Sequence, residues 1–396
     1  MKIFQLPDIA QYYPKPKVPM LPVFNPNELS LQQQPKPFSR FLQSDVLYLP
    51  SGRVALYYAL QLLNIDSQSE VLIPAYHCGS MVEPVIYLGA TPRLFHLNAK
   101  LQVQTEELET HITPHTKALL LPHFFGFPQD LVSIKAFCDK HQIALIEDCA
   151  HCFFSQAHAD GIGSIGDFSI TSTVKFFPGV EGGALACNNP NYDLTSIQRT
   201  APSIPVQLKS LLHTLELSAG YNRLGALGKL LNSRNGKAYL TEIPAGIATD
   251  TCITRTLTED SLQWFTPAQI GKDATVGTRL FTRHSDMQSI IDKRRNNFQR
   301  YLDAFKTTAS IKPLHQQLPD RVVPYIFPLL LEDPQHHFSR LKLAGVPIWR
   351  WEELVTSDGP VSTDYRLSLI QLPCHQSLKD EEIEWIINTI QATVDS

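Results

Sequence analysis

The chain has 396 residues, of which 43% are hydrophobic and 18% charged, with a formal net charge of −4. This length is enough for two domains with sizeable cores. The slightly negative charge argues against non-specific nucleic-acid binding, which needs a basic surface. No apolar run approaches the ~18 residues that span a bilayer, and the N-terminus lacks the basic start and apolar core of a signal peptide.

The seven cysteines are scattered along the chain, at positions 78, 138, 149, 152, 187, 252 and 374. An odd count without a regular spacing predicts reduced thiols and a cytoplasmic location. Cys149, His151 and Cys152 would suit a metal, but no second Cys/His pair lies nearby in the sequence. We therefore expect no zinc site there.

Residues 1–45 are rich in proline and glutamine and predict an extended arm rather than a domain. Residues 47–63 predict a short strand, a turn at Ser51-Gly52, and a helix with apolar residues at helical spacing. A small-residue turn before a helix offers free backbone N–H groups at the positive end of the helix dipole. Such a turn suits a phosphate group.

Residues 71–90 predict a buried strand, a turn and a helix, and further strands are expected at residues 93–96 and 118–123. Residues 131–141 predict the helix that precedes the central strand. This alternation predicts an α/β fold with a doubly wound, mostly parallel sheet and right-handed crossovers. Ligands of such sheets bind at the carboxyl ends of the strands. We therefore expect one edge of the sheet to bring together Gly52, Tyr76, Asp148 and Lys175.

The most informative stretch spans residues 143–185. Its first strand, residues 143–146, ends on Glu147 and Asp148, and Lys175 follows a second strand-like segment. A lysine amine can bind the aldehyde of pyridoxal 5'-phosphate, and a carboxylate can keep the pyridine nitrogen protonated. An acid pair after a strand is also common in other α/β proteins. The pyridoxal-phosphate interpretation therefore depends on the neighbouring motifs.

Four blocks in a fixed order resemble the DegT/DnrJ/EryC1/StrS family of pyridoxal-phosphate sugar aminotransferases, which has fold type I. They are Glu147-Asp148-Cys149-Ala150-His151, Gly163-Ser164-Ile165-Gly166-Asp167, Lys175, and Val180-Glu181-Gly182-Gly183. The resemblance covers about residues 45–200 and 265–396. It is weak in the N-terminal arm and in residues 201–260.

The resemblance implies that Ser51 and Gly52 hold the cofactor phosphate, where the family has Ser-Gly-Thr. This chain has Arg53 instead of the threonine, and a guanidinium can replace the lost hydroxyl contact. Between Asp167 and Lys175 the chain is one residue longer than the family pattern. The phosphate-binding serine of the family therefore corresponds to Ser169 or Ser172.

The family also has an aromatic residue that stacks on the pyridine ring, and its position falls on Cys78 here. Tyr76 and His77 are both close enough in sequence to replace it. His151 occupies the position of the family's Gln or His near the cofactor's phenolic oxygen. Asn222, in a faint match at residues 221–223, corresponds to an asparagine that reaches the phosphate of the partner subunit.

Residues 204–217 predict an apolar-rich helix, and residues 224–231 predict another. Such helices usually belong to the core or to a dimer surface, and the lining of an apolar substrate site is the alternative. We divide the chain into an arm (1–45), a large cofactor-binding domain (46–265, with an insert at 201–260), and a connecting helix with a small α+β domain (266–396).

The resemblance implies an aminotransferase in which Lys175, Asp148 and His151 carry the chemistry. The expected donor is glutamate or a similar amino acid, and the expected acceptor is a nucleotide-linked ketosugar or related intermediate. A homodimer with shared active sites is also implied. Two alternatives are a pyridoxal-dependent lyase or C–C bond-forming enzyme, and a non-catalytic cofactor-binding or regulatory protein.

Overall fold

The computed structural model describes residues 1–29, 37–156, 161–225, 228 and 251–395. Its largest element is a seven-stranded sheet in the order β2-β8-β7-β6-β5-β3-β4. The strands are β2 (Leu47–Leu49), β3 (Glu70–Pro74), β4 (Thr91–Phe95), β5 (Thr116–Pro122), β6 (Ala144–Asp148), β7 (Phe168–Thr171) and β8 (Gly183–Cys187). The pairs from β4 through β7 are parallel, whereas β8 runs antiparallel to both β7 and β2.

Helices cover both faces of this sheet. One face packs on α1 (Gly52–Leu62) and α2 (Gly79–Tyr87), and the other on α4 (Leu131–His141). The short helix α3 (Thr105–Glu109) lies in the connection to β5. Strands covered on both sides bury alternate residues in both layers, which explains their continuous apolar runs. The doubly wound, mostly parallel sheet is confirmed, as is the helix at residues 131–141.

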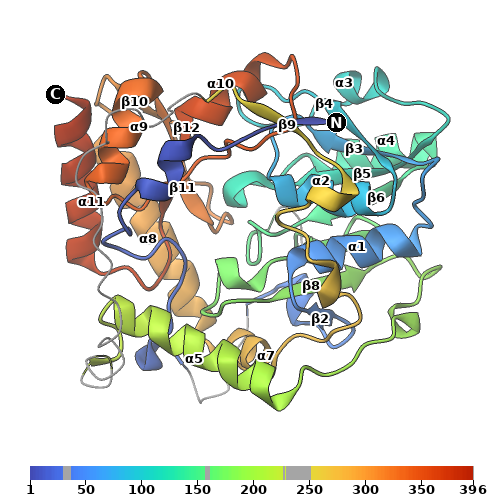
Figure 1. The fold of residues 1–396 in the computed structure, drawn as a ribbon, viewed down its shortest axis with the longest axis horizontal. Helices are drawn as coiled ribbons and strands as arrows, with labels where there is room; N and C mark the ends of the chain where they lie inside the picture. Colours follow the sequence, from blue (N-terminus) through green and yellow to red (C-terminus); the bar gives the residue numbers. More distant parts are fainter. Residues whose placement is uncertain (30–36, 157–160, 226–227, 229–250, 396) are drawn as a thin grey trace.

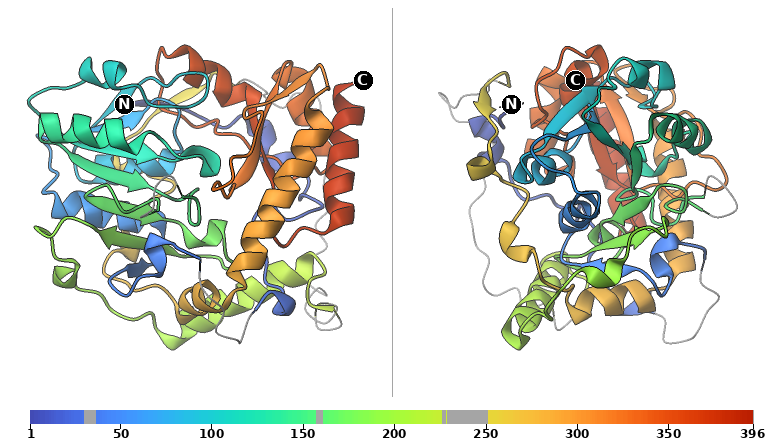
Figure 2. Two further views of the ribbon diagram at one scale, coloured as in Figure 1. Left: turned by 180° about the vertical axis from the view of Figure 1, so that it is seen from behind. Right: turned by 90° about the vertical axis from the view of Figure 1, so that its right-hand side faces the viewer.

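A second, three-stranded antiparallel sheet stands beside the first (Figures 1 and 2). It consists of β10 (Ile311–Pro313), β11 (Ile326–Leu331) and β12 (Leu369–Pro373). The helices around it are α8 (Met287–Phe305), α9 (Pro334–Leu343), α10 (Pro360–Ser368) and α11 (Asp380–Val394). This part forms its own apolar cluster, in which α8 and α11 pack on the sheet.

The N-terminal arm runs between these two parts, as the dark blue trace in Figure 1 shows. Its short strand β1 (Lys2–Phe4) pairs antiparallel with β9 (Thr254–Thr256). Ile3 also bridges to Val355, and the hydroxyl of Tyr13 hydrogen-bonds to Ser339 on α9 at 2.7 Å. The arm is therefore anchored to segments far away in the sequence.

The first predicted helix of the insert is present as α5 (Ile204–Gly220), which lies beside α7 (Val276–His284) at the lower edge in Figure 1. The second, at residues 224–231, lies largely outside the described residues. Among the helices that the structure describes, none is long and apolar enough to cross a membrane.

Candidate active site

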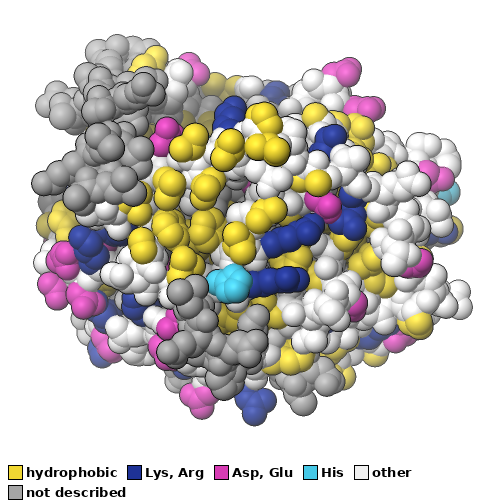
Figure 3. Space-filling view, turned by 90° about the horizontal axis from the view of Figure 1, so that it is seen from below, with side chains coloured by type: hydrophobic (Ala, Val, Ile, Leu, Met, Phe, Trp, Pro, Cys, Tyr) yellow, Lys and Arg dark blue, Asp and Glu magenta, His cyan; other side chains and the backbone are white. Residues whose placement is uncertain are grey.

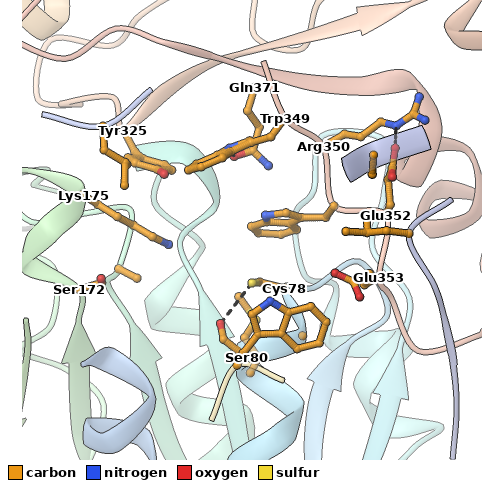
Figure 4. Close-up of a pocket in the computed structure, with 18 of the residues that line it drawn as sticks. Cys78, Ser80, Ser172, Lys175, Tyr325, Trp349, Arg350, Glu352, Glu353 and Gln371 are labelled. Carbon is orange, nitrogen blue, oxygen red and sulfur yellow. Dashed lines mark hydrogen bonds and ion pairs between the residues drawn. The ribbon is translucent and has the colours of Figure 1, made fainter. Parts of the chain in front are cut away.

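A pocket of about 1360 Å³ opens where the arm, the carboxyl ends of the large sheet and the small sheet meet. Figure 4 shows it with Lys175 and Ser172 on one side and Glu353 on the other. The residues predicted from the sequence that line it are Ser51, Gly52, Arg53, Asp148, His151, Ser172 and Lys175. Side chains that are up to 124 positions apart in the sequence thus meet in one cavity.

Asp148 is the last residue of β6, and Lys175 ends a 3-10 turn after β7, so neighbouring strands bring them to the same edge. Burial lowers the pKa of the Lys175 amine and raises the pKa of the Asp148 carboxyl. One oxygen of Asp148 accepts the Ala150 N–H at 2.9 Å. No ion pair joins Asp148 to Lys175 or to another described residue, so both groups remain available to a ligand.

Glu147 has a different role, because successive strand residues point to opposite faces of a sheet. Its fully buried carboxylate accepts backbone N–H groups from Gly163, Ile165 and Gly166, and contacts the His123 ring at 3.2 Å. The carboxylate thus fixes the loop before β7. Of the two acids at the end of β6, only Asp148 faces the pocket.

The N-terminus of α1 forms the floor of the pocket beside Ser172. Ser51 caps the helix by accepting the Val54 N–H at 3.4 Å. Glycine is needed at position 183, since a Cβ there would lie 2.2 Å from the Ser51 backbone. This close packing fixes the first turn of α1, and Gly52 and Arg53 of this turn line the cavity. The N-terminus of a helix can bind an anion there.

The structure distinguishes between the two serines that were candidates for the phosphate contact. Ser172 lines the pocket, whereas Ser169 is fully buried in β7 and does not line it. The Ser169 hydroxyl has no hydrogen-bond partner among the described residues. Ser172 is therefore the better placed of the two for a phosphate contact.

Arg53 extends from the first turn of α1 to the carbonyl of Trp264, to which its guanidinium donates. Burial lowers the pKa of this guanidinium. Within the part of the chain that the structure describes, no carboxylate forms an ion pair with it. A partly buried cation of this kind favours an anionic ligand.

Trp264 was not singled out in the sequence, and its placement depends on α2. The buried carboxylate of Glu83 accepts the backbone N–H groups of Gln263, Trp264 and Phe265. The indole lies over Gly79, where a Cβ would approach it to 2.4 Å. An aromatic ring from residue 264 therefore covers the pocket beside Cys78.

His151 is buried against the pocket wall and accepts the Phe125 N–H at Nδ1, at 3.1 Å. Burial lowers the pKa of the imidazole well below its usual range, so the ring is neutral near pH 7. The proton then resides on Nε2. Stacking on Tyr325, with ring centroids 4.5 Å apart, fixes the ring, and the Lys175 amine lies 5.1 Å from the centroid of the same tyrosine.

Tyr76 and His77 were predicted to stack on the cofactor ring, which requires a side chain that lines the pocket. Neither residue lines it. Tyr76 is fully buried against Trp351, with ring centroids 5.0 Å apart, and does not line the pocket. His77 donates from Nδ1 to the Pro74 carbonyl and accepts the Val355 N–H at Nε2. These bonds use both imidazole nitrogens, so this expectation is not met by either residue.

Asn222 lies just after α5 with a left-handed φ of 56° and does not line the pocket of its own chain. The apolar side chains of α5 do not line it either. The alternative in which this helix lines an apolar substrate site is therefore not supported. Several of these side chains are instead exposed.

Arg294 is a positioning residue that the sequence did not identify. Its fully buried guanidinium donates to the backbone carbonyls of Lys175 (2.7 Å) and Tyr325 (2.9 Å). It therefore ties the lysine turn of the large sheet to the segment that enters β11. A signal was present, because Arg294 falls between Ile290 and Phe298 on the apolar stripe of α8.

These groups fit pyridoxal phosphate. The α1 N-terminus, Ser172 and Arg53 suit its phosphate, the unpaired Asp148 carboxyl suits the ring nitrogen, and the Lys175 amine suits its aldehyde. Two departures from the family pattern remain, the guanidinium at position 53 and the missing aromatic side chain at Cys78.

Comparisons with known proteins point to aminotransferases. Residues 35–223 match the model of the DegT/DnrJ/EryC1/StrS aminotransferase family. A UDP-N-acetyl-3-dehydro-alpha-D-glucosamine 3-aminotransferase of Acidithiobacillus ferrooxidans is 38% identical over 135 residues, or 34% of this chain and 36% of that protein. A GDP-perosamine synthase of Vibrio cholerae is 31% identical over 156 residues, or 38% and 42%. The matches thus span well under half the length of these relatives.

Solved structures extend the likeness of the fold over most of the chain. The aminotransferase TlmJ from Streptoalloteichus hindustanus has a TM-score of 0.60 at 18% identity, covering 89% of this chain and 86% of its own. Spr1654 from Streptococcus pneumoniae, in its PLP form, has a TM-score of 0.61 at 18% identity, covering 88% and 87%. At this identity the likeness establishes fold type I.

Proposed function

Since residues 35–223 match the model of the DegT/DnrJ/EryC1/StrS aminotransferase family, we propose that this protein is a member of that family and a pyridoxal-phosphate aminotransferase. It moves an amino group from glutamate or a similar donor to the keto group of a nucleotide-linked sugar or related intermediate. The observation that carries the proposal is the joint exposure of the Lys175 amine and the Asp148 carboxyl to one pocket above the α1 N-terminus.

The cofactor, when bound, supplies an aldehyde that takes up the amino group and a ring that accepts electron density. Lys175 then holds and moves the proton at its Nζ, which is favoured because burial lowers the pKa of the amine. Asp148 holds the proton at the pyridine nitrogen. The Nε2–H of the neutral His151 is a donor for the phenolic oxygen.

The acceptor is the part of the proposal that depends most on the size of the pocket. Its volume of about 1360 Å³ exceeds the roughly 300–1,000 Å³ of ordinary ligand sites. Room therefore remains for a large second substrate next to the cofactor. The names of the two curated relatives support a nucleotide-linked sugar in that space.

A visible absorption spectrum of the purified protein with pyridoxal phosphate tests the proposal. We expect a band from the lysine-bound cofactor that bleaches when glutamate is added and returns when a keto sugar nucleotide follows. A band that ignores glutamate and other amino donors would favour the lyase alternative. No band at all would favour the non-catalytic one.

We further propose that the protein is a homodimer with α5 and α7 at the interface. Large apolar side chains of both helices are exposed together, and Figure 3 looks onto this face. They are Ile204, Val206, Leu208, Leu211 and Leu212 of α5, and Val276 and Leu280 of α7. Asn222 follows α5 directly and does not line its own pocket. A second copy seated on this face would cover the apolar side chains and bring Asn222 near the partner's site.

The double variant Leu208→Lys/Leu212→Lys should be a monomer. Each leucine loses about 1.5–3 kcal/mol of burial at the interface, so the dimer dissociation constant should rise at least about 100-fold. Sedimentation velocity measures this constant. Val132→Lys, on the exposed side of α4, is the matched control and should leave the dimer intact. A double variant that dimerises as tightly as the wild type would place the interface elsewhere.

We also propose a cytoplasmic location. All seven cysteines lie in the part of the chain that the structure describes, and none of them forms a disulfide, as is usual in a reducing compartment.

A further inference from the structure

Residues 349–353, Trp-Arg-Trp-Glu-Glu, form an extended segment along the wall of the pocket, which we call the pocket strap. At its start, Trp349 bridges to Gln371 of β12, and its indole N–H donates to the Gln371 side chain at 2.9 Å. Just beyond its end, Val355 bridges to Ile3 of the arm. The strap is thus held by the small sheet at one end and by the arm at the other.

The second and fourth residues of the strap carry opposite charges and pair with each other. Arg350 and Glu352 form an ion pair, with both side chains about 94% buried. Arg350 also donates to the Leu367 carbonyl and stacks on the Phe338 ring, 3.6 Å from its centroid. Figure 4 shows this pair at the edge of the cavity. The two opposite charges are therefore neutralised within the strap itself.

The odd positions, which share one face of an extended segment, carry the two tryptophans and Glu353. Trp351 packs beside His151, with ring centroids 5.7 Å apart, and so continues the aromatic wall from the lysine site. Trp349 uses its N–H on Gln371 and offers its ring to the pocket. The walls are therefore flat and apolar.

Glu353 is the exception in this wall. It is half-buried, and no hydrogen bond or ion pair from another described residue reaches its carboxylate. Burial raises the pKa of this carboxyl to about 7, although nearby Arg255 opposes the shift. In Figure 4, Glu353 enters the cavity from the side opposite Lys175. A carboxylate that loses water without gaining a partner is costly, so a ligand that donates hydrogen bonds is favoured there.

The chemistry of this wall favours the sugar acceptor over the amino donor. At a pH above about 7, where Glu353 is ionised, its charge would repel a dicarboxylate donor or a phosphate group, so neither is favoured at this position. A hexose ring presents apolar C–H faces to the indoles and adjacent hydroxyl donors to the carboxylate. The hydroxyl groups gain charge-assisted hydrogen bonds, which are stronger than neutral ones.

We propose that Glu353, flanked by Trp349 and Trp351, binds the hydroxyl groups of the hexose ring in the keto acceptor. Glu353 is therefore a specificity-determining residue for the acceptor and not for the amino donor. This inference rests on the proposed aminotransferase function. It places the hexose ring at the pocket strap and the phosphate groups on the Arg53 side of the pocket.

Titration calorimetry of the cofactor-loaded protein tests the assignment with UDP-glucose against UDP, and GDP-mannose against GDP. We expect at least one sugar nucleotide to bind the wild type about tenfold more tightly than its bare nucleotide. Glu353→Gln should remove this advantage and leave the affinity for the bare nucleotide unchanged, because a hydrogen bond to a charged group is worth about tenfold or more. Glu353→Asp should restore part of it.

Glu106→Gln on the exposed surface of α3 is the matched control and should behave as the wild type. An equal loss of sugar-nucleotide and bare-nucleotide binding in Glu353→Gln, or no loss at all, overturns the assignment. So does a wild type that binds neither sugar nucleotide better than its nucleotide. Bleaching of the cofactor band by glutamate should be unaffected in Glu353→Gln, and its failure in the wild type would count against the proposed function instead.

Discussion

Lys175→Ala should lower the rate of amino transfer by about 10⁴-fold, because it removes the amine that moves the proton in the proposed mechanism. The backbone of residue 175 is held by Arg294, and this bond does not depend on the lysine side chain. The turn should therefore keep its shape. Stopped-flow absorbance with glutamate measures the rate, and the visible band of the lysine-bound cofactor should be absent in this variant.

Thermal unfolding separates this loss from misfolding. Burial lowers the pKa of the Lys175 amine, so the charged amine does not stabilise the fold and its removal should not destabilise the protein without cofactor. Lys100→Ala, on the surface, serves as the control for a lost positive charge. Transfer at a rate near that of the wild type in Lys175→Ala would mean that another base acts. His151 is then the next residue to replace, because it lines the same pocket.

Local sequence patterns predicted the elements that surround the site. The helix at residues 131–141 and the closing helix at residues 380–394 have the expected bounds, and the alternation of strands and helices predicted the doubly wound sheet. Because carboxyl ends of parallel strands meet at one edge, the same pattern could anticipate that Asp148 and Lys175 approach each other. Those inferences need only short-range periodicity and one topological rule.

The parts of the site that depend on contacts between distant segments could not be predicted from local sequence patterns. His77 points away from the cavity because it is bonded to the Val355 backbone, 278 positions later in the chain. Trp264 reaches the pocket because Glu83, 181 positions earlier, holds its backbone. No pattern in the turn after β3 or in the linker before α7 encodes either contact. The aromatic walls therefore come from residues whose local sequence is uninformative.

Asp148→Asn should lower the transfer rate by about 10²–10³-fold, as expected when one preorganised electrostatic partner is lost. An asparagine oxygen can still accept the Ala150 N–H that Asp148 accepts now, at 2.9 Å. The loss should therefore come from the missing charge opposite the pyridine nitrogen. Stopped-flow absorbance measures the rate, and equilibrium dialysis should show weaker binding of pyridoxal phosphate.

The same substitution should stabilise the cofactor-free protein, although it slows the reaction. Burial raises the pKa of the Asp148 carboxyl in the folded chain, so at a pH above that pKa the ionised carboxyl destabilises the folded state. Asparagine removes this penalty, and the melting temperature of the cofactor-free variant at pH 8 should rise above that of the wild type. Asp320→Asn, at an exposed position, should change neither quantity. A cofactor-free Asp148→Asn protein that melts lower would show that the carboxylate supports the fold, whereas a higher melting temperature with slower transfer would show that it is retained for the cofactor.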